Sequence, residues 1–300
     1  MKIFIAGGTG FVGAAMVNHL AARGHELVLL ARTPAAVDAP RGVRVVPGDV
    51  FNPNLAGFMS GCDAAINLIG IIRAFPARGI TFEKLHVDAT RAMVDAAKKA
   101  GVRRYLQMSA NSVRPDGISE YQRTKSRAEA YVKASGLDWT IFRPSLIFGD
   151  PGGKNEFCKQ LFLNFRPAPV IPMFGDGNYR LQPVHVDDVA RAFGGALEKP
   201  ETAGRIFHIG GDVTYSYREI LNMIFLGAGK PPRPKLPVPW FLARPFVALL
   251  GRFPAFPATA EQIDMLLEGN TIPENEFKKV FGIAPIPLTV ENLAYLKKYA

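Results

Sequence analysis

Three observations in the 300-residue sequence predict an α/β protein built on a parallel sheet. Short apolar runs alternate with helix-periodic stretches over residues 1–150, which is typical of βαβ units. The first run, Lys2 to Ala6, passes directly into a glycine-rich turn and then into an apolar helical stretch. The second run, Glu26 to Ala31, is apolar after its first residue, as expected of a strand buried on both faces. We therefore predict a Rossmann-type doubly wound parallel sheet with a small, partly discontinuous C-terminal lobe.

The glycine-rich turn covers residues 7–13 and reads Gly-Gly-Thr-Gly-Phe-Val-Gly. It fits both G-x-G-x-x-G and G-x-x-G-x-x-G, and it stands between a strand and a helix, as a dinucleotide-binding motif does. In that motif the glycines make the tight turn and let the backbone approach a pyrophosphate. The helix N-terminus then binds the anion through free N–H groups and the helix dipole. The alternative is a glycine-rich loop without a ligand, which the well-placed second strand disfavours.

The remaining elements follow in order along the chain. Strands are expected at 43–47, 63–70, 103–109, from 139 onward and at 205–209, and helices at 14–22, 82–100, 120–134 and 187–197. After Gly149 the alternation breaks down among prolines and glycines, and from Thr214 we expect proline-interrupted helices. We predict a dinucleotide-binding core at 1–150, to which 183–212 return, and a smaller substrate or partner lobe at 151–182 and 213–300.

Composition narrows the class of protein. With 48% hydrophobic and 21% charged residues the chain is globular rather than disordered. Cys62 and Cys158 are the only cysteines, so we expect no disulfide framework and a reducing, cytoplasmic location. Neither a signal peptide nor a membrane-spanning segment is expected. The net charge of +10 favours phosphate-bearing ligands or anionic lipid, whereas the scattered basic residues and histidines predict neither nucleic-acid nor metal binding.

Arg32 follows the second predicted strand directly, and no acidic residue lies between Glu26 and Asp38. An acidic residue near this point binds the ribose 2′-hydroxyl in NAD sites, whereas an arginine accommodates the 2′-phosphate of NADP. The sequence therefore favours NADP(H) over NAD(H). The alternative is an arginine that ends the strand in solvent.

Tyr121 and Lys125 form a Y-x-x-x-K motif at the start of the helix that follows the fifth strand. Residues four apart share one helical face, so the phenol and the ammonium can meet the same ligand. A nearby ammonium stabilises the phenolate, so we expect Lys125 to lower the pKa of Tyr121 and suit it to general acid/base work. The alternative is a chance pair on a solvated helix face.

These features together resemble the extended short-chain dehydrogenases/reductases. Besides the glycine and Tyr-Lys motifs, the likeness rests on Asp49, Arg143-Pro144-Ser145 and the run Val184 to Ala190, and it covers roughly residues 1–225. Ile66 to Gly70, Gln182-Pro183-Val184 and the short gap between Ser109 and Tyr121 are similar to the atypical branch. That branch includes a nucleotide-binding accessory subunit of respiratory complex I and its bacterial relatives.

The resemblance and the motifs together define the predicted site. The predicted cofactor-binding residues are Gly7, Gly8, Thr9, Gly10, Phe11, Val12, Gly13, Arg32, Asp49, Val50, Leu68, Ile69, Gly70 and Lys125. Asp49 contacts the adenine amine or, alternatively, caps the following turn. The predicted catalytic residues are Tyr121, Lys125 and Ser109.

Two departures from the family pattern bear on catalysis. Ala110 stands where active members carry a Ser or Thr that binds the substrate carbonyl, and either Ser109 or Ser112 is a candidate substitute. His86 replaces the asparagine usual in the helix after strand four. Since the atypical branch keeps the cofactor site while losing catalytic groups, cofactor binding is the safer inference.

The stretch Val238 to Phe256 interleaves seven aromatic or leucine residues with Arg244 and Arg252; the seven are Trp240, Phe241, Phe246, Leu249, Leu250, Phe253 and Phe256. One interpretation is a helix pair of the smaller lobe packed on the core. The other is an interfacial element or a lid for an apolar substrate, with arginines facing lipid phosphate.

Two functions are therefore open. The first is an NADP(H)-dependent oxidoreductase, or an epimerase- or dehydratase-like enzyme, acting on a small apolar carbonyl or alcohol. Tyr121 would be its general acid/base and Lys125 the electrostatic partner. The second, implied by the resemblance, is a non-catalytic NADPH-binding accessory or assembly protein of a respiratory or quinone-related complex. Either fits the cytoplasm or peripheral association with the inner face of a membrane.

Overall fold

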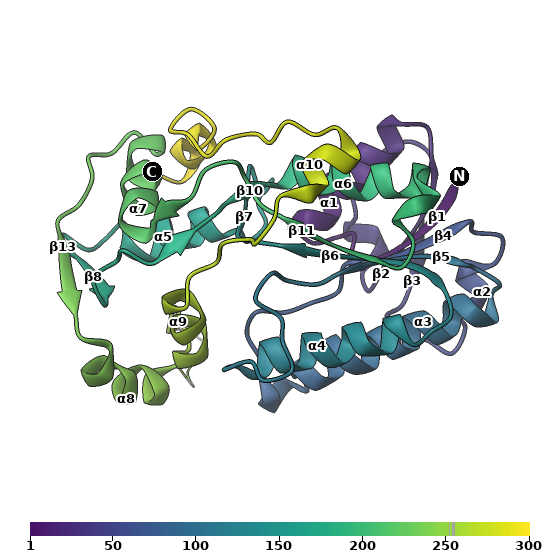
Figure 1. The fold of residues 1–300 in the computed structure, drawn as a ribbon, viewed down its shortest axis with the longest axis horizontal. Helices are drawn as coiled ribbons and strands as arrows, with labels where there is room; N and C mark the ends of the chain where they lie inside the picture. The colour runs from purple at the N-terminus through teal and green to yellow at the C-terminus, as the bar shows by residue number, and fades with distance from the viewer. Residues whose placement is uncertain (252, 254–255) are drawn as a thin grey trace. The chain divides into compact units, whose positions relative to one another are not determined.

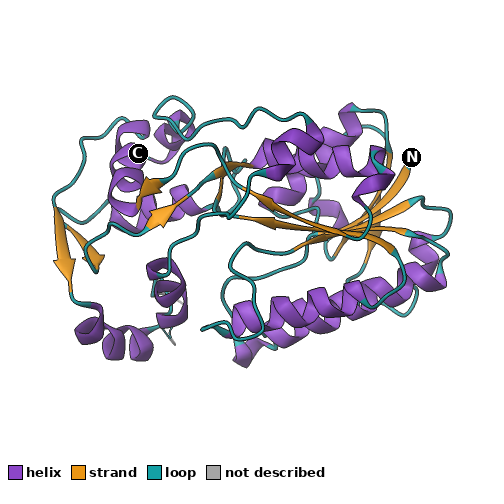
Figure 2. Ribbon diagram, viewed as in Figure 1, coloured by secondary structure: helices purple, strands orange, loops and turns teal. Residues whose placement is uncertain are grey.

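A seven-stranded parallel sheet forms the centre of the larger part of the molecule (Figures 1 and 2). The computed structural model describes residues 1–251, 253 and 256–300. The strands are β1 (Lys2–Ala6), β2 (Glu26–Ala31), β3 (Val43–Pro47), β4 (Ala64–Asn67), β5 (Arg104–Met108), β6 (Asp138–Pro144) and β11 (Arg205–Ile209). Their order is β11-β6-β5-β4-β1-β2-β3, and every neighbouring pair is parallel. The order reverses at β1, so the predicted doubly wound Rossmann-type sheet is confirmed.

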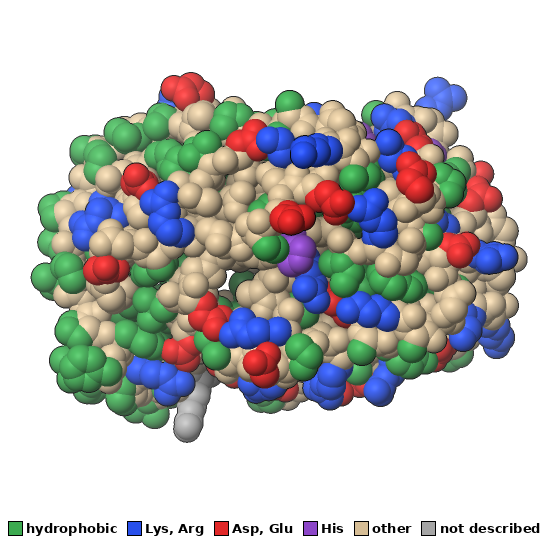
Figure 3. Space-filling view, in the orientation of Figure 1, with side chains coloured by type: hydrophobic (Ala, Val, Ile, Leu, Met, Phe, Trp, Pro, Cys, Tyr) green, Lys and Arg blue, Asp and Glu red, His purple; other side chains and the backbone are tan. Residues whose placement is uncertain are grey.

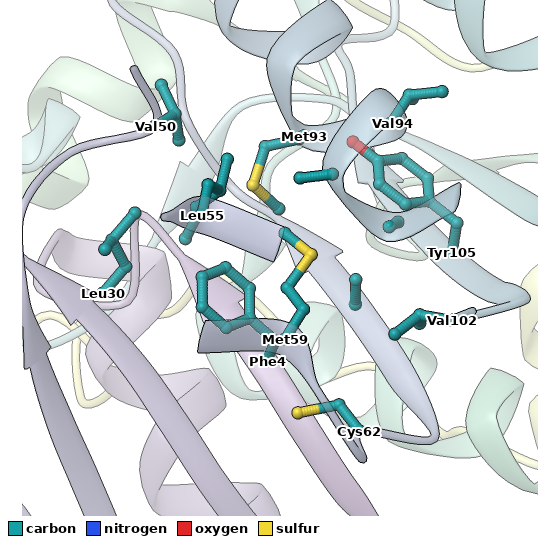
Figure 4. Packing of buried hydrophobic residues seen from close by; sticks show 14 of the residues in the cluster. Phe4, Leu30, Val50, Leu55, Met59, Cys62, Met93, Val94, Val102 and Tyr105 are labelled. Carbon is teal, nitrogen blue, oxygen red and sulfur yellow. The ribbon is translucent and has the colours of Figure 1, made fainter. Parts of the chain in front are cut away.

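Helices cover both faces of this sheet (Figure 1). One face carries α1 (Phe11–Ala22), α6 (Val186–Glu198) and α10 (Glu276–Phe281). The other carries α2 (Leu55–Met59), α3 (Ala89–Lys99) and α4 (Glu120–Lys133). Under this second face Phe4, Met59, Met93 and Tyr105 are fully buried in one apolar cluster (Figure 4). The cluster fixes the sheet and its helices as a rigid support for the loops at the strand ends.

The chain forms two compact units. Unit 1 comprises Met1–Pro144, Val186–Ile209 and Glu276–Ala284, and unit 2 comprises Ser145–His185, Gly210–Asn275 and Pro285–Ala300. Residues 276–284, expected in the smaller lobe, belong to unit 1, where they form α10. As boundaries between functional domains, the residue ranges expected from the sequence stay a prediction.

Unit 2 is built from short strand pairs and helices. The pairs are β7 (Ile147–Phe148) with β10 (Val184–His185), β9 (Arg180–Leu181) with β12 (Tyr215–Ser216), and β8 (Ile171–Phe174) with β13 (Lys235–Val238). The helices are α5 (Phe157–Phe165), α7 (Tyr217–Gly227), α8 (Trp240–Leu250) and α9 (Ala260–Leu267). The expectation of helices alone after Thr214 is wrong at β12 and β13. These strands have two and four residues and pair with distant segments, which local patterning does not reveal.

No helix in the described part of the chain is both long and apolar enough to cross a bilayer.

Candidate functional site

The glycine-rich turn joins β1 to α1 in a backbone arrangement that side chains would disrupt. Gly7 has a φ of +83°, and a Cβ there would lie 2.9 Å from the carbonyl carbon of Leu68. A Cβ on Gly13 would lie 2.3 Å from the carbonyl oxygen of Gly7, so the first turn of α1 packs directly on the strand exit. Gly8 is buried, and a Cβ there would lie 2.3 Å from the Leu29 side chain. These three glycines therefore permit close packing of the turn.

The N-terminus of α1 is available to an anion. Gly10 is the N-cap and is exposed, and within the described residues neither a capping side chain nor an acidic residue in the first turn compensates the helix end. The first N–H groups of a helix have no partner within it. Thr9 is exposed while Phe11 and Val12 are half-buried, so backbone here is accessible. The turn fits the pyrophosphate of a dinucleotide, which needs backbone donors and close approach.

Arg32 and Asp49 follow β2 and β3, and both are exposed. None of the described residues forms an ion pair or hydrogen bond with the Arg32 side chain, so its guanidinium is available to a ligand. Asp49 Oδ1 accepts a hydrogen bond of 2.9 Å from the N–H of Phe51. The turn-capping alternative for Asp49 is thus present, and it occupies one of the two carboxylate oxygens. Val50 is buried in the core, which leaves only its backbone for a ligand.

The segment after β4 is held in place by its own hydrogen bonds. The predicted strand 63–70 ends at Asn67, and the N–H of Leu68 donates to the Ala6 carbonyl at 2.9 Å. The N–H of Ile69 donates to Asn67 Oδ1 at 3.1 Å. Gly70 is exposed, and a Cβ there would come within 2.9 Å of Lys125 Nζ. The absence of a side chain at Gly70 therefore leaves space for the Lys125 ammonium.

Lys125 is almost fully buried on α4, with 4% of its surface exposed. A capping box between Ser119 and Gln122 starts the helix one turn earlier and fixes its direction. Lys125 Nζ donates to the carbonyl oxygens of Ile69 at 3.4 Å and Met108 at 3.3 Å. Burial lowers the pKa of Lys125 to about 8, partly offset by the charge of Glu129.

Tyr121 lies one turn before Lys125 on the same helix. Its ring packs edge-on against His86 (centroids 5.2 Å apart) and Phe82 (6.0 Å). No hydrogen-bond partner for its hydroxyl is found in the described part of the chain. Burial raises the pKa of Tyr121 to about 12. The expectation that Lys125 lowers this pKa is therefore wrong, because loss of solvation raises it and the ammonium is bonded to backbone carbonyls instead.

His86 is the aromatic neighbour of Tyr121 that connects two segments of the site. It belongs to a π-helical segment, η3 (Glu83–Asp88), so the predicted helix 82–100 is in fact η3 followed by α3. His86 Nδ1 is 2.8 Å from Thr124 Oγ1, and Nε2 is 3.1 Å from the carbonyl oxygen and 3.3 Å from the nitrogen of Ile71. Burial first, and Lys125 second, lower the pKa of His86 to about 2. The imidazole is therefore neutral, and it connects α4 to the segment after β4.

The Ser109 hydroxyl is already engaged. It donates to Glu129 Oε1 at 2.6 Å, and the same carboxylate accepts from Arg143 Nε at 2.8 Å and Nη2 at 2.6 Å. Ala110 provides no side-chain donor. Ser112 is half-buried, and its hydroxyl has no bonding partner within the described ranges, which makes it the more accessible of the two serines.

Sequence reasoning missed Glu129. It is 2% exposed and neutralises Arg143, while its charge also acts on Lys125. The signal was present, since Tyr121, Lys125 and Glu129 follow one another at intervals of four and so share a helical face. The structure brings Tyr121, Lys125, His86 and the segment after β4 together, and it directs Ser109 away into a buried ion pair. No cluster of three metal-ligating side chains occurs among the described residues.

Comparisons with known proteins agree with this geometry. The NAD(P)H-binding family matches residues 7–162, and the RmlD substrate binding domain matches residues 85–241. The mitochondrial NADH-ubiquinone oxidoreductase 40 kDa subunit of Neurospora crassa is 27% identical over 98% of this chain and 78% of its own length. Ceramide reductase of Caulobacter vibrioides is 31% identical over 63% of this chain and 59% of its own length.

The solved structures include a nucleoside-diphosphate-sugar epimerase from Staphylococcus aureus, with a TM-score of 0.78 and 20% identity over 98% of this chain and all of that one. This likeness shows the fold. The family match covers more than half of the chain and includes both the glycine turn and the Tyr-Lys pair. The chain therefore belongs to the NAD(P)-binding family of proteins like the extended short-chain dehydrogenases/reductases.

Proposed function

We propose that this protein is an NADP(H)-dependent oxidoreductase that interconverts an apolar carbonyl compound and its alcohol. The observation that carries the proposal is the phenol of Tyr121. Its hydroxyl has no partner in the described structure, although it lies on the same helical face as the buried ammonium of Lys125. Tyr121 is half-buried, so a hydroxyl without a protein partner is open to a ligand there, and groups with a perturbed pKa gather at functional sites.

The proposed cofactor site uses residues of unit 1 only. Gly7 to Gly13 would hold the pyrophosphate, Arg32 the 2′-phosphate, and the segment Leu68 to Gly70 one side of the nicotinamide half. When bound, NADP(H) supplies the hydride. Arg32 supports NADP(H) over NAD(H), because an exposed guanidinium without an ion-pair partner among the described residues attracts a phosphate and offers it a bidentate contact.

Tyr121 would exchange the proton. With a pKa near 12 the phenol is protonated at neutral pH, so it is poised to donate to a substrate oxygen as negative charge develops there. Lys125 stabilises the phenolate left behind, and an anionic ligand nearby would raise the lysine pKa from about 8 and keep it charged. Ser112 is the proposed second donor to the substrate oxygen, in place of the predicted Ser109.

The apolar substrate is supported by the ceramide reductase relative and by the character of the site. Phe82 and His86, both uncharged, surround the Tyr121 ring. Epimerase- and dehydratase-like chemistry can use the same proton exchange at a hydroxyl, so sugar nucleotides belong in the substrate panel.

The decisive experiment is the Tyr121→Phe variant. We expect turnover of the best substrate, measured by NADPH absorbance, to fall about 10²- to 10⁴-fold, because positioned proton transfer is worth that much. Calorimetry should show nearly unchanged NADPH affinity, since the phenol acts on the substrate. Ser109→Ala and Ser112→Ala form a matched pair of hydroxyl deletions. Because the Ser109 hydroxyl donates to Glu129, Ser112→Ala should lower turnover more than Ser109→Ala. Intact turnover in Tyr121→Phe would place the chemistry elsewhere.

A second function is favoured by Ala110 and by the engagement of Ser109. Ala110 has no hydroxyl, and the Ser109 hydroxyl donates to Glu129, so neither can donate a hydrogen bond to the substrate oxygen. Losing one such donor can lower the rate about 10²- to 10³-fold. A non-catalytic NADPH-binding accessory protein, as the complex I subunit relative suggests, would retain the glycine turn and Arg32 alone. An NADPH-induced rise in melting temperature without turnover on any carbonyl, alcohol or sugar nucleotide of the panel would establish this function.

A further inference from the structure

The helix α8 and its flanks have an outer surface that nothing in the described structure covers. Figure 3 shows hydrophobic side chains gathered at the lower left, where Figure 1 places α8. Exposed fractions lie between 42% and 76% for five side chains of the helix and one that follows it. These side chains are Phe241, Leu242, Phe246, Leu249, Leu250 and Phe253. The interpretation of this stretch as a helix pair packed on the core is wrong for them. Arg252, which the interfacial interpretation placed against lipid phosphate, lies outside the described residues.

The inner side of α8 is anchored firmly. Trp240 Nε1 donates to Asp264 Oδ1 of α9 at 2.7 Å, and Arg244 Nη2 lies 3.1 Å from Oδ2 of the same carboxylate. The Trp240 ring packs against Phe174 of β8 with centroids 5.1 Å apart, and Val247 is buried. The exposed side chains are therefore presented outward by a helix whose orientation its other face determines.

This arrangement inverts the usual pattern of a surface helix. A surface helix normally turns its apolar stripe inward and its charges outward, and contiguous exposed apolar patches mark interaction sites. Here polar groups face the protein and the outward stripe repeats Phe and Leu at a helical period. Such a surface needs an apolar environment on its outer side.

Charge decides which environment fits. From residue 220 to residue 260 the sequence contains no Asp or Glu, and besides Arg244, which is paired with Asp264, it contains Lys230, Arg233, Lys235 and Arg252. Cations flanking an apolar helical face of Phe and Leu are the pattern of an interfacial helix on anionic lipid. A second copy of the chain would bring the same basic residues to a self-complementary interface, where like charges oppose association.

We propose that α8, with Leu236 of β13 and Phe253 beside it, is a membrane-contact surface that inserts its apolar side chains among the lipids of an anionic bilayer. Leu236 is 59% exposed and extends the apolar patch along the preceding strand. The proposal depends on unit 2 alone and is independent of the oxidoreductase chemistry proposed for unit 1.

Co-sedimentation of the full chain with vesicles tests this proposal. We expect binding to 1:1 phosphatidylglycerol:phosphatidylcholine vesicles at low salt. The binding should weaken on pure phosphatidylcholine and in high salt, where the Debye length falls to about 3 Å. Phe241→Ser combined with Phe246→Ser should reduce the partition coefficient about 100-fold, since each buried Phe contributes roughly tenfold. In a Leu249→Trp variant, the fluorescence of the introduced tryptophan should be quenched by lipids with brominated acyl chains.

The matched control replaces Val213 and Leu226, two exposed apolar side chains of the same unit outside α8, by Ser. Binding should then be unchanged. Absence of sedimentation at low salt on both vesicle types would overturn the proposal. Equal losses of vesicle binding in the two double variants would also overturn it. A dimer in light scattering that only the Phe241→Ser/Phe246→Ser variant dissociates would instead assign the surface to a second copy of the chain.

Discussion

Lys125 and Arg32 are two basic side chains that the structure prepares in opposite ways. Lys125 is enclosed, and burial lowers its pKa to about 8. Its charge is therefore sensitive to the charge of a ligand that binds beside it. Arg32 stays exposed, and its planar guanidinium can bind a phosphate through two donors. The first is suited to respond to a substrate's charge, and the second to select a ligand that carries a phosphate.

Arg32→Asp tests that selection. We expect the wild-type protein to bind NADPH more tightly than NADH, because charge-assisted hydrogen bonds to the phosphate contribute roughly 1.5–3 kcal/mol, or about 10- to 100-fold in affinity. The substitution should reverse the order, since a carboxylate repels the phosphate and accepts from the ribose hydroxyls. Calorimetry with both cofactors measures this. Equal affinities in the wild-type protein would mean that Arg32 merely ends its strand in solvent.

At the scale of elements, the π-helical segment η3 is the feature that local patterning did not reveal. Apolar periodicity predicts a helix from 82 to 100, but it does not distinguish i→i+5 from i→i+4 bonding. The wider turn carries His86, whose ring nitrogens meet Thr124 of α4 and the backbone of Ile71. One imidazole thereby connects the helix of Tyr121 and Lys125 to the segment after β4. His86 is thus a positioning residue of the proposed site.

This role makes stability depend on pH. The folded-state pKa of His86, about 2, lies far below its unfolded value of 6.5, so the unfolded state binds the extra proton as pH falls below 6.5. The contribution of neutral His86 is fully present above pH 6.5 and declines progressively below it. Between pH 7 and pH 5 the wild-type protein should lose about 2 kcal/mol from this group alone.

His86→Asn removes this titration while leaving a polar side chain. We expect the variant to be less stable than wild type at pH 7, with the difference shrinking by about 2 kcal/mol at pH 5. Urea unfolding at the two pH values measures it. His25→Asn, at a partly exposed histidine, is the control and should change the pH dependence less. A stability difference independent of pH would show that His86 is not held neutral.

For the whole molecule, much of the sheet could be predicted because its signals are local. The ranges expected for β1, β2, β3 and β11 match the structure residue for residue, since apolar runs bounded by turn residues indicate buried strands. The Tyr121–Lys125 pair could be found by spacing alone. Ser109 could not be placed, because its engagement by Glu129 depends on how α4 packs beside β5 and β6.

Local sequence patterns also do not predict that residues 276–284 belong to unit 1. Nothing in residues 276–284 distinguishes them from their neighbours in composition, yet α10 packs on α6, and the Phe281 ring packs at an angle against Phe142 of β6 and edge-on against Phe207 of β11. A Cβ on Gly195 of α6 would come within 2.8 Å of the Phe281 ring, so the absence of a side chain there permits the contact. Long-range complementarity of this kind is read only from the fold.

Since α10 belongs to unit 1, the stability of the cofactor-binding unit should depend on the end of the chain. Phe277 is fully buried, and Phe277→Ala should lower the free energy of unfolding by about 3–5 kcal/mol, as truncation of a buried phenylalanine usually does. Trp139 lies in unit 1 and Trp240 in unit 2, and they are the only tryptophans. In a Trp240→Phe background, urea unfolding followed by fluorescence therefore reports on unit 1. Phe246→Ala removes an exposed ring of unit 2 and should leave the Trp139 transition in place. If Phe277→Ala also leaves it in place, α10 does not support the sheet.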